Sequence, residues 1–430
     1  MSGWAKRAAA TVLATALAVP GAAHGASGDS AAPLFFAGHL KGQGAWTRIP
    51  GDSALGEALG SSATDLFGET RLRLGLGSGP WSAALDYQLL AIEADTLRLG
   101  QSLSPAFAPF AAVVDDRRRW FDLTHVIDER DTGVLLQRLD RVSVTYSGER
   151  LVWRFGRQAI SWGNGLLFTP MDVFNPFDPA TVDREYKPGD DMLYGQYLFA
   201  DGSDLQAVAV VRRDPVSGDT TDQGSLAFKY HGFAGRGEFD LLAARHFDQP
   251  LLAVGGNLPV GDALWRGDLT WTDTDHGATW SAVASLSRSW TWGGRNVSGV
   301  LELYRNGFGQ RDGRYAPAEL AANPELLQRL ARGELFTLGR NYLAASLLVE
   351  WHPLLQLTPN LFVNLDDPSA LAQLVLRWDW RQDLQLLAAL NLPVGPAGSE
   401  YGGPPSGEPG EFLETGAGLF AQLAWYFQHE

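Results

Sequence analysis

Apolar and polar side chains alternate along most of the chain from residue 35 onward. Within residues 278–289, for example, Trp280 and Ala282 fall on one side of the chain while Thr279 and Ser281 fall on the other. A period of two residues indicates β-strands. The alternating runs are about 10 residues long, whereas strands of soluble sandwiches are nearer 5–6 residues and carry more Lys and Glu on exposed faces. The pattern therefore predicts strands whose apolar side faces lipid.

The alternation divides into eighteen predicted strands, with sixteen as the alternative count. They span residues 35–47, 64–76, 80–92, 134–146, 150–159, 192–200, 204–213, 224–232, 237–246, 251–258, 263–272, 278–290, 295–305, 335–351, 354–365, 370–379, 383–393 and 412–428. The predicted fold class is all-β, in the form of a transmembrane antiparallel β-barrel.

The lengths of the connections support a barrel independently of the alternation. Connections that follow even-numbered strands are tight turns, such as those at 77–79 and 293–294. The long insertions all follow odd-numbered strands, at 48–63, 93–133, 160–191, 306–334 and 394–411. Short turns on one rim and long loops on the other are typical of outer-membrane barrels, where the short turns are periplasmic.

The first residues have the pattern of a secretory signal peptide. Two basic residues precede an apolar run that ends at Val19, and small residues follow it,. After Val19 no apolar run reaches the ~18–20 residues that a membrane-spanning helix needs, so entry into a membrane has to use strands. We therefore predict a signal peptide at 1–25 and a single barrel domain at 26–430.

Composition narrows the chemistry. Removal of the signal peptide, which contains Lys6 and Arg7, takes the formal charge from −15 to −17 and argues against a nucleic-acid partner,. The absence of Cys excludes disulfides, thiolate metal sites and covalently attached c-type haem, and we expect no cofactor,. The 15 Trp, 11 Tyr and 21 Phe residues suit the aromatic girdles of a membrane barrel,.

Residues 149–191 combine a strand with a long connection rich in proline. Pro170, Pro176, Pro179 and Pro188 exclude helix or ladder pairing through most of the connection,. Insertions of this length in a compact domain are usually functional or disordered. The aromatic content of this one argues against disorder, so we expect an ordered, functional loop.

Three motifs in this stretch carry a resemblance to a known family. They are Phe-Gly-Arg-Gln at 155–158, Trp-Gly-x-Gly at 162–165 and Asp-x-x-Asn-Pro at 172–176. Together they resemble a segment of the alginate-export and phosphate-selective porin-like group of Gram-negative outer-membrane barrels. In that group a strand ending in Gly-Arg-Gln leads into a loop that folds into the lumen. The resemblance implies that residues 163–191 form such an infolded loop, and it specifies no substrate.

The candidate constriction residues lie in this loop or at its root. They are Arg154, Arg157, Gln158, Asp172, Asn175, Asp178, Arg184 and Glu185. Infolded loops and rings of charge set the selectivity of pores. Residues 163–191 contain six acidic and two basic side chains, which favours cations or neutral polar solutes. The alternative is that these acids only solvate the loop or pair with arginines of the wall.

Arg157 is a special case because strict alternation would aim it at lipid, at a cost of about 2–4 kcal/mol at the midplane,. We expect a bulge that re-aims Arg157 and lets it anchor the infolded loop to the wall. The alternative is a position at the outer rim, where the guanidinium faces lipid headgroups.

Strand phase also assigns nine basic and nine acidic side chains to the lumen. The basic ones are Lys41, Arg71, Arg73, Arg141, Arg154, Lys229, Arg266, Arg340 and Arg377. The acidic ones are Glu69, Asp86, Glu238, Asp240, Asp268, Glu302, Glu350, Asp379 and Asp383. An unpaired ion in a dry cavity costs several kcal/mol, so such a lumen is either filled with water or plugged by salt bridges. A calcium site at Asp183, Glu185, Asp190 and Asp191 is a further alternative, although the spacing matches no known calcium loop,.

Three further segments carry predictions. Residues 316–333 read as a helical external loop, capped by Asn323, that packs over the barrel mouth without a gating role,. Residues 93–133 are expected to be mainly solvated surface. The last strand resembles the closing strand that the barrel-assembly machinery recognises, although three residues follow Phe427 instead of the chain ending on an aromatic.

These patterns predict a porin of the bacterial outer membrane through which small polar or charged solutes diffuse, not an enzyme. Its expected partners are outer-membrane lipid, the barrel-assembly machinery and the solutes. One alternative is a barrel that sheathes a periplasmic partner protein, as in a porin-cytochrome electron conduit. Another is an outer-membrane lipid hydrolase, for which the sequence shows no Gly-x-Ser-x-Gly motif,.

Overall fold

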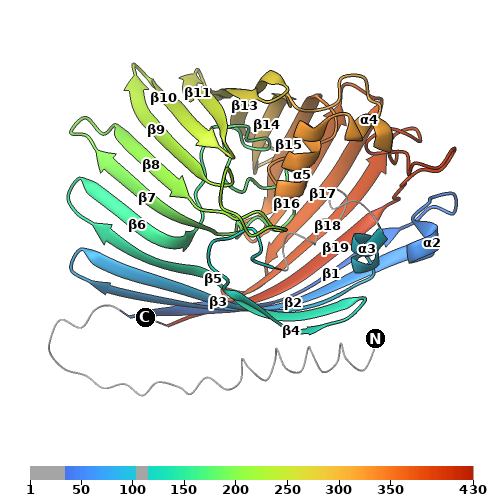
Figure 1. The fold of residues 1–430 in the computed structure, drawn as a ribbon, viewed down its shortest axis with the longest axis horizontal. Helices are drawn as coiled ribbons and strands as arrows, with labels where there is room; N and C mark the ends of the chain where they lie inside the picture. Colours follow the sequence, from blue (N-terminus) through green and yellow to red (C-terminus); the bar gives the residue numbers. More distant parts are fainter. Residues whose placement is uncertain (1–33, 103–114, 430) are drawn as a thin grey trace.

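The computed structural model describes residues 34–102 and 115–429, in which a single sheet of 19 strands closes on itself (Figure 1). The strands are β1 (Phe35–Arg48), β2 (Ser62–Ser78), β3 (Trp81–Ala94), β4 (Thr124–Glu129), β5 (Gly133–Ser147), β6 (Leu151–Gln158), β7 (Asp190–Leu198), β8 (Asp204–Val210), β9 (Ser225–Ala234), β10 (Gly237–His246), β11 (Gln249–Val260), β12 (Ala263–Thr274), β13 (Gly277–Trp292), β14 (Arg295–Arg305), β15 (Asn341–His352), β16 (Leu355–Asn364), β17 (Ser369–Asp379), β18 (Leu384–Val394) and β19 (Gly418–His429). The helices are α2 (Gly56–Leu59), α3 (Leu97–Ser102), α4 (Pro317–Ala321) and α5 (Pro324–Arg332).

Eighteen of these strands, all except β4, form a closed antiparallel barrel in which each strand pairs with its neighbours in sequence. β1 closes the barrel by pairing with β19, in a register that runs from Phe36 opposite His429 to Thr47 opposite Gly418. Closure leaves no free sheet edge, which is what a strand-built membrane protein requires. The prediction of an all-β barrel with eighteen strands is confirmed.

The two faces of the wall differ as the alternation predicted. On β14, Leu301 and Leu303 are 47% and 55% exposed, while Glu302 between them is fully buried. The exposed apolar face is therefore the outside of the barrel, and the polar positions point inward. Exposed apolar side chains at every second position would be unfavourable in water, but they are favourable against lipid.

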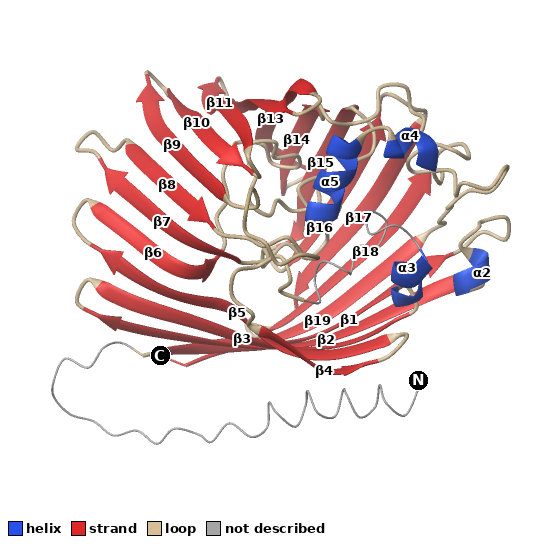
Figure 2. Ribbon diagram, in the orientation of Figure 1, coloured by secondary structure: helices blue, strands red, loops and turns tan. Residues whose placement is uncertain are grey.

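The two rims also differ. Eight connections of two to five residues, from the turn between β2 and β3 to the one between β17 and β18, lie on one rim. The start of β1 and the end of β19 lie on this same rim, because Phe35 pairs with Gly75 beside the β2–β3 turn and Phe36 pairs with His429. The long connections lie on the opposite rim, where α2 to α5 are found (Figure 2).

Two predicted strand boundaries were wrong. The strand predicted from residue 335 begins at Asn341, because Leu335 and Leu338 pack against the cluster around α5 instead of joining the wall. The strand predicted from residue 412 begins at Gly418.

The assignment of residues 93–133 to solvated surface was also wrong in part, because these residues include β4. On the edge of β5 opposite β3, residues 134–138 pair with β4 and residues 142–147 pair with β6. β4 therefore continues the wall beyond the point where β6 ends. Residues 103–114 of this segment lie outside the described part of the chain.

The range 316–333 contains two short helices, α4 and α5. The Asn323 side chain accepts a hydrogen bond from the Leu326 amide and caps α5, and Leu326 is buried with Tyr315 and Leu320. No helix within residues 34–102 and 115–429 has the length and apolar character needed to span a membrane. The predicted signal peptide, residues 1–25, lies outside the described residues and stays a prediction.

Candidate functional site: the connection between β6 and β7

Residues 159–189 connect β6 to β7, and we call them the lumen loop. β6 is only 8 residues long, and near its end Gly156 has a φ of 122°, where a Cβ atom would lie 2.1 Å from the Val142 carbonyl oxygen. Only glycine fits this position, and the chain leaves the wall two residues later. The four prolines of the loop then prevent it from continuing as a ladder strand.

Two carboxylates of the wall hold the first part of the lumen loop. Glu302 on β14 accepts hydrogen bonds from three consecutive backbone amides, those of Leu166 at 2.6 Å, Leu167 at 3.0 Å and Phe168 at 2.9 Å. Asp268 on β12 accepts from the Asn164 amide at 2.7 Å and from its side chain at 2.8 Å. Both carboxylates lie on the inner face of the barrel, so this part of the loop is inside it.

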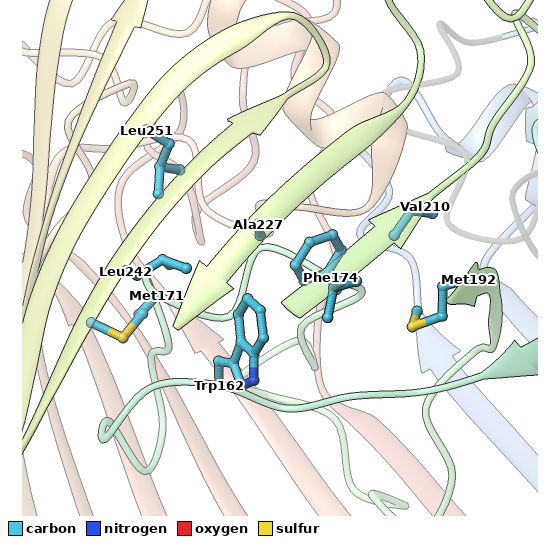
Figure 3. Packing of buried hydrophobic residues seen from close by; sticks show 9 residues of the cluster. Trp162, Met171, Phe174, Met192, Val210, Ala227, Leu242 and Leu251 are labelled. Atoms are coloured by element: carbon cyan, nitrogen blue, oxygen red, sulfur yellow. The ribbon is translucent and has the colours of Figure 1, made fainter. Parts of the chain in front are cut away.

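Apolar side chains secure the same part of the loop. Trp162, Met171 and Phe174 pack against inward-facing residues of β7 to β11 (Figure 3), namely Met192, Val208, Val210, Ala227, Leu242 and Leu251. Phe168 stacks on Tyr304 with ring centroids 4.4 Å apart. Full burial of such a side chain stabilises a structure by about 1.5–3 kcal/mol. The list of charged lumen residues did not predict this apolar section of the inner wall. Its side chains pack against the lumen loop.

The second part of the loop is held by other strands of the wall, from β17 through β1 and β2 to β5. Gln373 on β17 donates a hydrogen bond to the Ala180 carbonyl at 2.8 Å. Lys41 on β1 forms ion pairs with Asp183 at 2.8 Å and Glu185 at 2.6 Å. The lumen loop therefore contacts strands on both sides of the barrel.

Residues 186 and 187 complete these contacts. The Arg71 guanidinium on β2 lies 4.0 Å from the centroid of the Tyr186 ring. Arg141 on β5 donates to the Lys187 carbonyl at 2.5 Å. Arg71 in turn bonds Asp140 at 2.8 Å, so the cation that supports Tyr186 is itself fixed in place.

The three candidate residues at the root of the loop differ in their surroundings. Arg154 donates to the Thr145 hydroxyl at 2.9 Å and reaches no residue of the lumen loop. Gln158 is buried and donates to the carbonyl oxygens of Arg154 and Met192, both at 3.2 Å. These two side chains therefore stabilise the end of β6.

Arg157 is fully buried and anchors the wall. It bonds Asp191 at 2.8 Å, Asp116 at 2.9 Å and the Phe121 carbonyl at 2.7 Å. The expected bulge was wrong, because the register of β6 with both neighbours is continuous through this residue. Arg157 escapes lipid because the segment before β4 covers it, and it joins that segment to the β6–β7 pair.

The candidates within the lumen loop are dispersed along it. Asp172 is buried and pairs with Lys187, while Asp178 accepts a bond from the Ala180 amide at 2.8 Å. Burial raises the pKa of both carboxyls, that of Asp172 to about 6 even though the Lys187 charge lowers it. Asn175 has a φ of 56°, which is a turn conformation that Asn tolerates,.

Arg184 and Glu185 occupy the part of the loop nearest β1. Arg184 donates to the Thr181 carbonyl at 3.2 Å and so braces the loop internally. Glu185 pairs with Lys41 and accepts from the Tyr426 hydroxyl at 2.9 Å. Burial raises the pKa of Glu185, but the hydrogen bond and charge of Lys41 outweigh it and leave the pKa below its usual range.

Wall cations neutralise the acids for which a calcium site was an alternative. Asp183 and Glu185 bind Lys41, Asp190 binds Arg212 and Asp191 binds Arg157. Within residues 34–102 and 115–429 no group of His, Asp or Glu side chains is arranged to hold a metal ion. Asp183 and Glu185 therefore tether the lumen loop to the wall, and Asp190 and Asp191 fix the start of β7, in line with the alternative that these acids pair with basic residues of the wall.

Sequence reasoning missed the residues that matter most for holding the loop, Glu302 and Asp268. Their inward direction was predicted, but nothing local in the sequence pairs them with residues more than 100 positions away.

Ser225 on β9, His246 on β10 and Glu334 form a Ser-His-acid arrangement. The Ser225 hydroxyl is 2.8 Å from His246 Nδ1, and His246 Nε2 is 3.3 Å from Glu334. Arg212 donates to the same hydroxyl at 2.9 Å. Ser225 is 6% exposed, and it is not among the residues that line the cavity next to His246. With its oxygen engaged by Arg212 and no place in the cavity lining, Ser225 is a structural hydroxyl that links Arg212, just beyond β8, to His246 on β10.

Comparison with known proteins shows the fold alone. No protein-family model and no curated protein matches the sequence. Among solved structures, OccAB3 of Acinetobacter baumannii has a TM-score of 0.52 at 9% identity, covering 92% of this chain and 99% of that chain. OccK2 (OpdF) of Pseudomonas aeruginosa has a TM-score of 0.50 at 11% identity, covering 92% and 98%. An anion-selective porin from Comamonas acidovorans has a TM-score of 0.44 at 12% identity, covering 92% and 100%.

The raised pKa of Asp172 gives a prediction for pH dependence. As the pH falls through about 6 the carboxyl takes up a proton, so the ion pair with Lys187 is lost and the lumen loop gains one positive charge. Because the folded pKa of Asp172 lies above the ordinary Asp value of 3.8, this group favours the folded loop more as the pH falls from about 6 towards 3.8,. We expect the cation-to-anion permeability ratio of the purified barrel in a planar bilayer, measured by reversal potential, to fall below pH 6.

Asp172→Asn should remove this step. Burial also raises the pKa of Glu400, to about 7, so Glu400→Gln is the matched control and should leave the step near pH 6 in place. A step that persists unchanged in Asp172→Asn would contradict the assignment.

Proposed function

We propose that this protein is an outer-membrane channel through which small polar or charged solutes diffuse, with the lumen loop as its constriction. The observation that carries the proposal is a loop held inside a closed barrel by contacts to nearly opposite parts of the wall, namely Asp268 on β12 and Lys41 on β1. The apolar outer face suits a bilayer. Under this proposal the rim of short turns faces the periplasm and the rim of long loops faces the exterior.

Candidate constriction residues are those that the lumen loop presents beside the walls, including Asp172, Asn175, Asp178, Arg184 and Glu185. Arg154, Arg157 and Gln158 would act by fixing the end of β6 from which the loop departs. Membership of the alginate-export and phosphate-selective porin-like group is the finer part of the proposal, and the three motifs between residues 155 and 176 support it. Assembly would require the barrel-assembly machinery and outer-membrane lipid.

The sheath alternative is less well supported than the channel. A barrel that encloses a partner protein needs a free bore, whereas the lumen loop takes up part of this one. The hydrolase alternative would need an accessible nucleophile, which Ser225 does not provide.

Selectivity tests the proposed constriction. Lys41→Gln leaves Asp183 and Glu185 without their shared cation, so we expect the reversal potential across a planar bilayer to shift towards cation selectivity. Arg377→Gln is the control, because Arg377 is a half-exposed lumen cation that bonds Asp379 and not the lumen loop. An equal shift in the two variants would show that ions are not selected at the loop.

A further inference from the structure

A cavity that opens to solvent lies between the lumen loop, residues 334–337 and the inner faces of β11 to β14. It is near the rim of long loops, since its wall residues come from the strand ends on that side. Five aromatic side chains line it, namely Phe168, Phe177, Tyr304, Phe308 and Phe336.

The charged groups around this cavity are already engaged by the protein. Asp172 pairs with Lys187, and Glu334 bonds His246 at 3.3 Å. Arg329 pairs with Glu325 at 2.5 Å and lies over the Phe308 ring at 3.7 Å. A charged ligand would have to break one of these pairs and leave a buried ion behind, which costs more than a new pair returns.

Two hydroxyl groups that face the cavity are, by contrast, not engaged by other described residues. Thr272 and Tyr304 line it and are each only 6% exposed. Among the residues that the structure describes, neither hydroxyl has a hydrogen-bond partner. On the same face of β12, by contrast, the Thr274 hydroxyl donates to the Gly277 carbonyl at 2.9 Å. The Thr272 and Tyr304 hydroxyls are therefore free to form hydrogen bonds with a solute in the cavity,.

We propose that this cavity is a binding subsite for an uncharged, ring-shaped solute that carries hydroxyl groups. The inference rests on the proposed channel function, to which it adds a substrate class. Aromatic walls pack against the face of the ring, while Thr272 and Tyr304 bond its hydroxyls. A neutral pyranose and a phenol share this chemistry.

Calorimetric titration of the purified full-length barrel in detergent tests the subsite. The probes are glucose and phenol, with glucuronate and benzoate as their charged counterparts and empty micelles as the blank. We expect glucose or phenol to bind. The probe that binds shows whether the site takes a pyranose or an aromatic ring. Thr272→Val and Tyr304→Phe should each weaken binding by about three- to tenfold, since each removes one neutral hydrogen bond.

Thr274→Val is the matched control, because it removes a hydroxyl from the same face of the same strand at a position outside the cavity. It should bind like the unmodified protein. Failure of both neutral probes to bind, equal or tighter binding of the charged probes, or equal weakening in Thr274→Val would each overturn the subsite. Conductance of the same preparations in a bilayer is measured separately. A barrel that conducts but binds neither neutral probe refutes the subsite alone. A barrel that does not conduct refutes the channel.

Discussion

Replacing residues 166–187 with a flexible Gly-Ser linker should raise single-channel conductance several-fold in a planar bilayer. The replaced residues include the loop side of the contacts to Glu302 and Lys41, so their removal clears the loop from the bore while the wall keeps its pairing. Conductance increases with the open cross-section of the pore, and the narrowest part of the pore limits it most. Removing the loop from that part should therefore raise the current.

The control for this change is a linker of the same kind in place of residues 398–410, in the connection between β18 and β19. That segment is also a long loop on the same rim, but it forms no part of the lumen loop. Unchanged conductance after replacement of 166–187, or an equal rise in both variants, would refute the role of the lumen loop as constriction.

Glu302→Ala should detach the first part of the lumen loop from β14. The substitution leaves three amides, those of Leu166, Leu167 and Phe168, without their acceptor. The Phe168 amide is buried, and a buried unsatisfied group costs about 1–3 kcal/mol,. A loop that lacks this anchor should fluctuate, so we expect noisier and larger single-channel currents. Trypsin should also cleave after Arg184 faster than in the unmodified protein.

Glu302→Gln should have a smaller effect, because its remaining oxygen still accepts a hydrogen bond. Glu350→Ala is the control, since Glu350 is another lumen carboxylate but bonds Asn296 near the rim of short turns. If Glu350→Ala changed current noise and proteolysis as much as Glu302→Ala, the effect would come from lost lumen charge and not from the lost anchor.

For Glu302 and Lys41, the sequence predicted the direction of the side chains but not their partners. Alternation placed Glu302 and Lys41 on the lumen face, because the period of two in a strand is a local property of the backbone. It could not name their partners, which lie 136 and 142 residues away in sequence. Such contacts depend on the closure of the barrel and on the path of a loop without periodicity.

Arg157 and β4 also show what the sequence pattern could not predict. The period of two correctly aimed Arg157 outward, and we expected either a bulge that re-aims it or a position at the outer rim. The segment before β4 covers it instead, with Asp116 as its partner. That segment is irregular and β4 is only 6 residues long, too short for its alternation to be distinguished within a long insertion.

The sequence by itself determined the barrel, the number of its wall strands, the face that each strand turns outward and the rim on which the long connections lie. These features follow from a repeating local pattern that lipid enforces along each strand. Only the tertiary structure decided where the lumen loop runs, which wall carboxylates hold it and which charges cancel. Those contacts join residues far apart in the chain, and their energies depend on burial and geometry that appear only once the wall has closed.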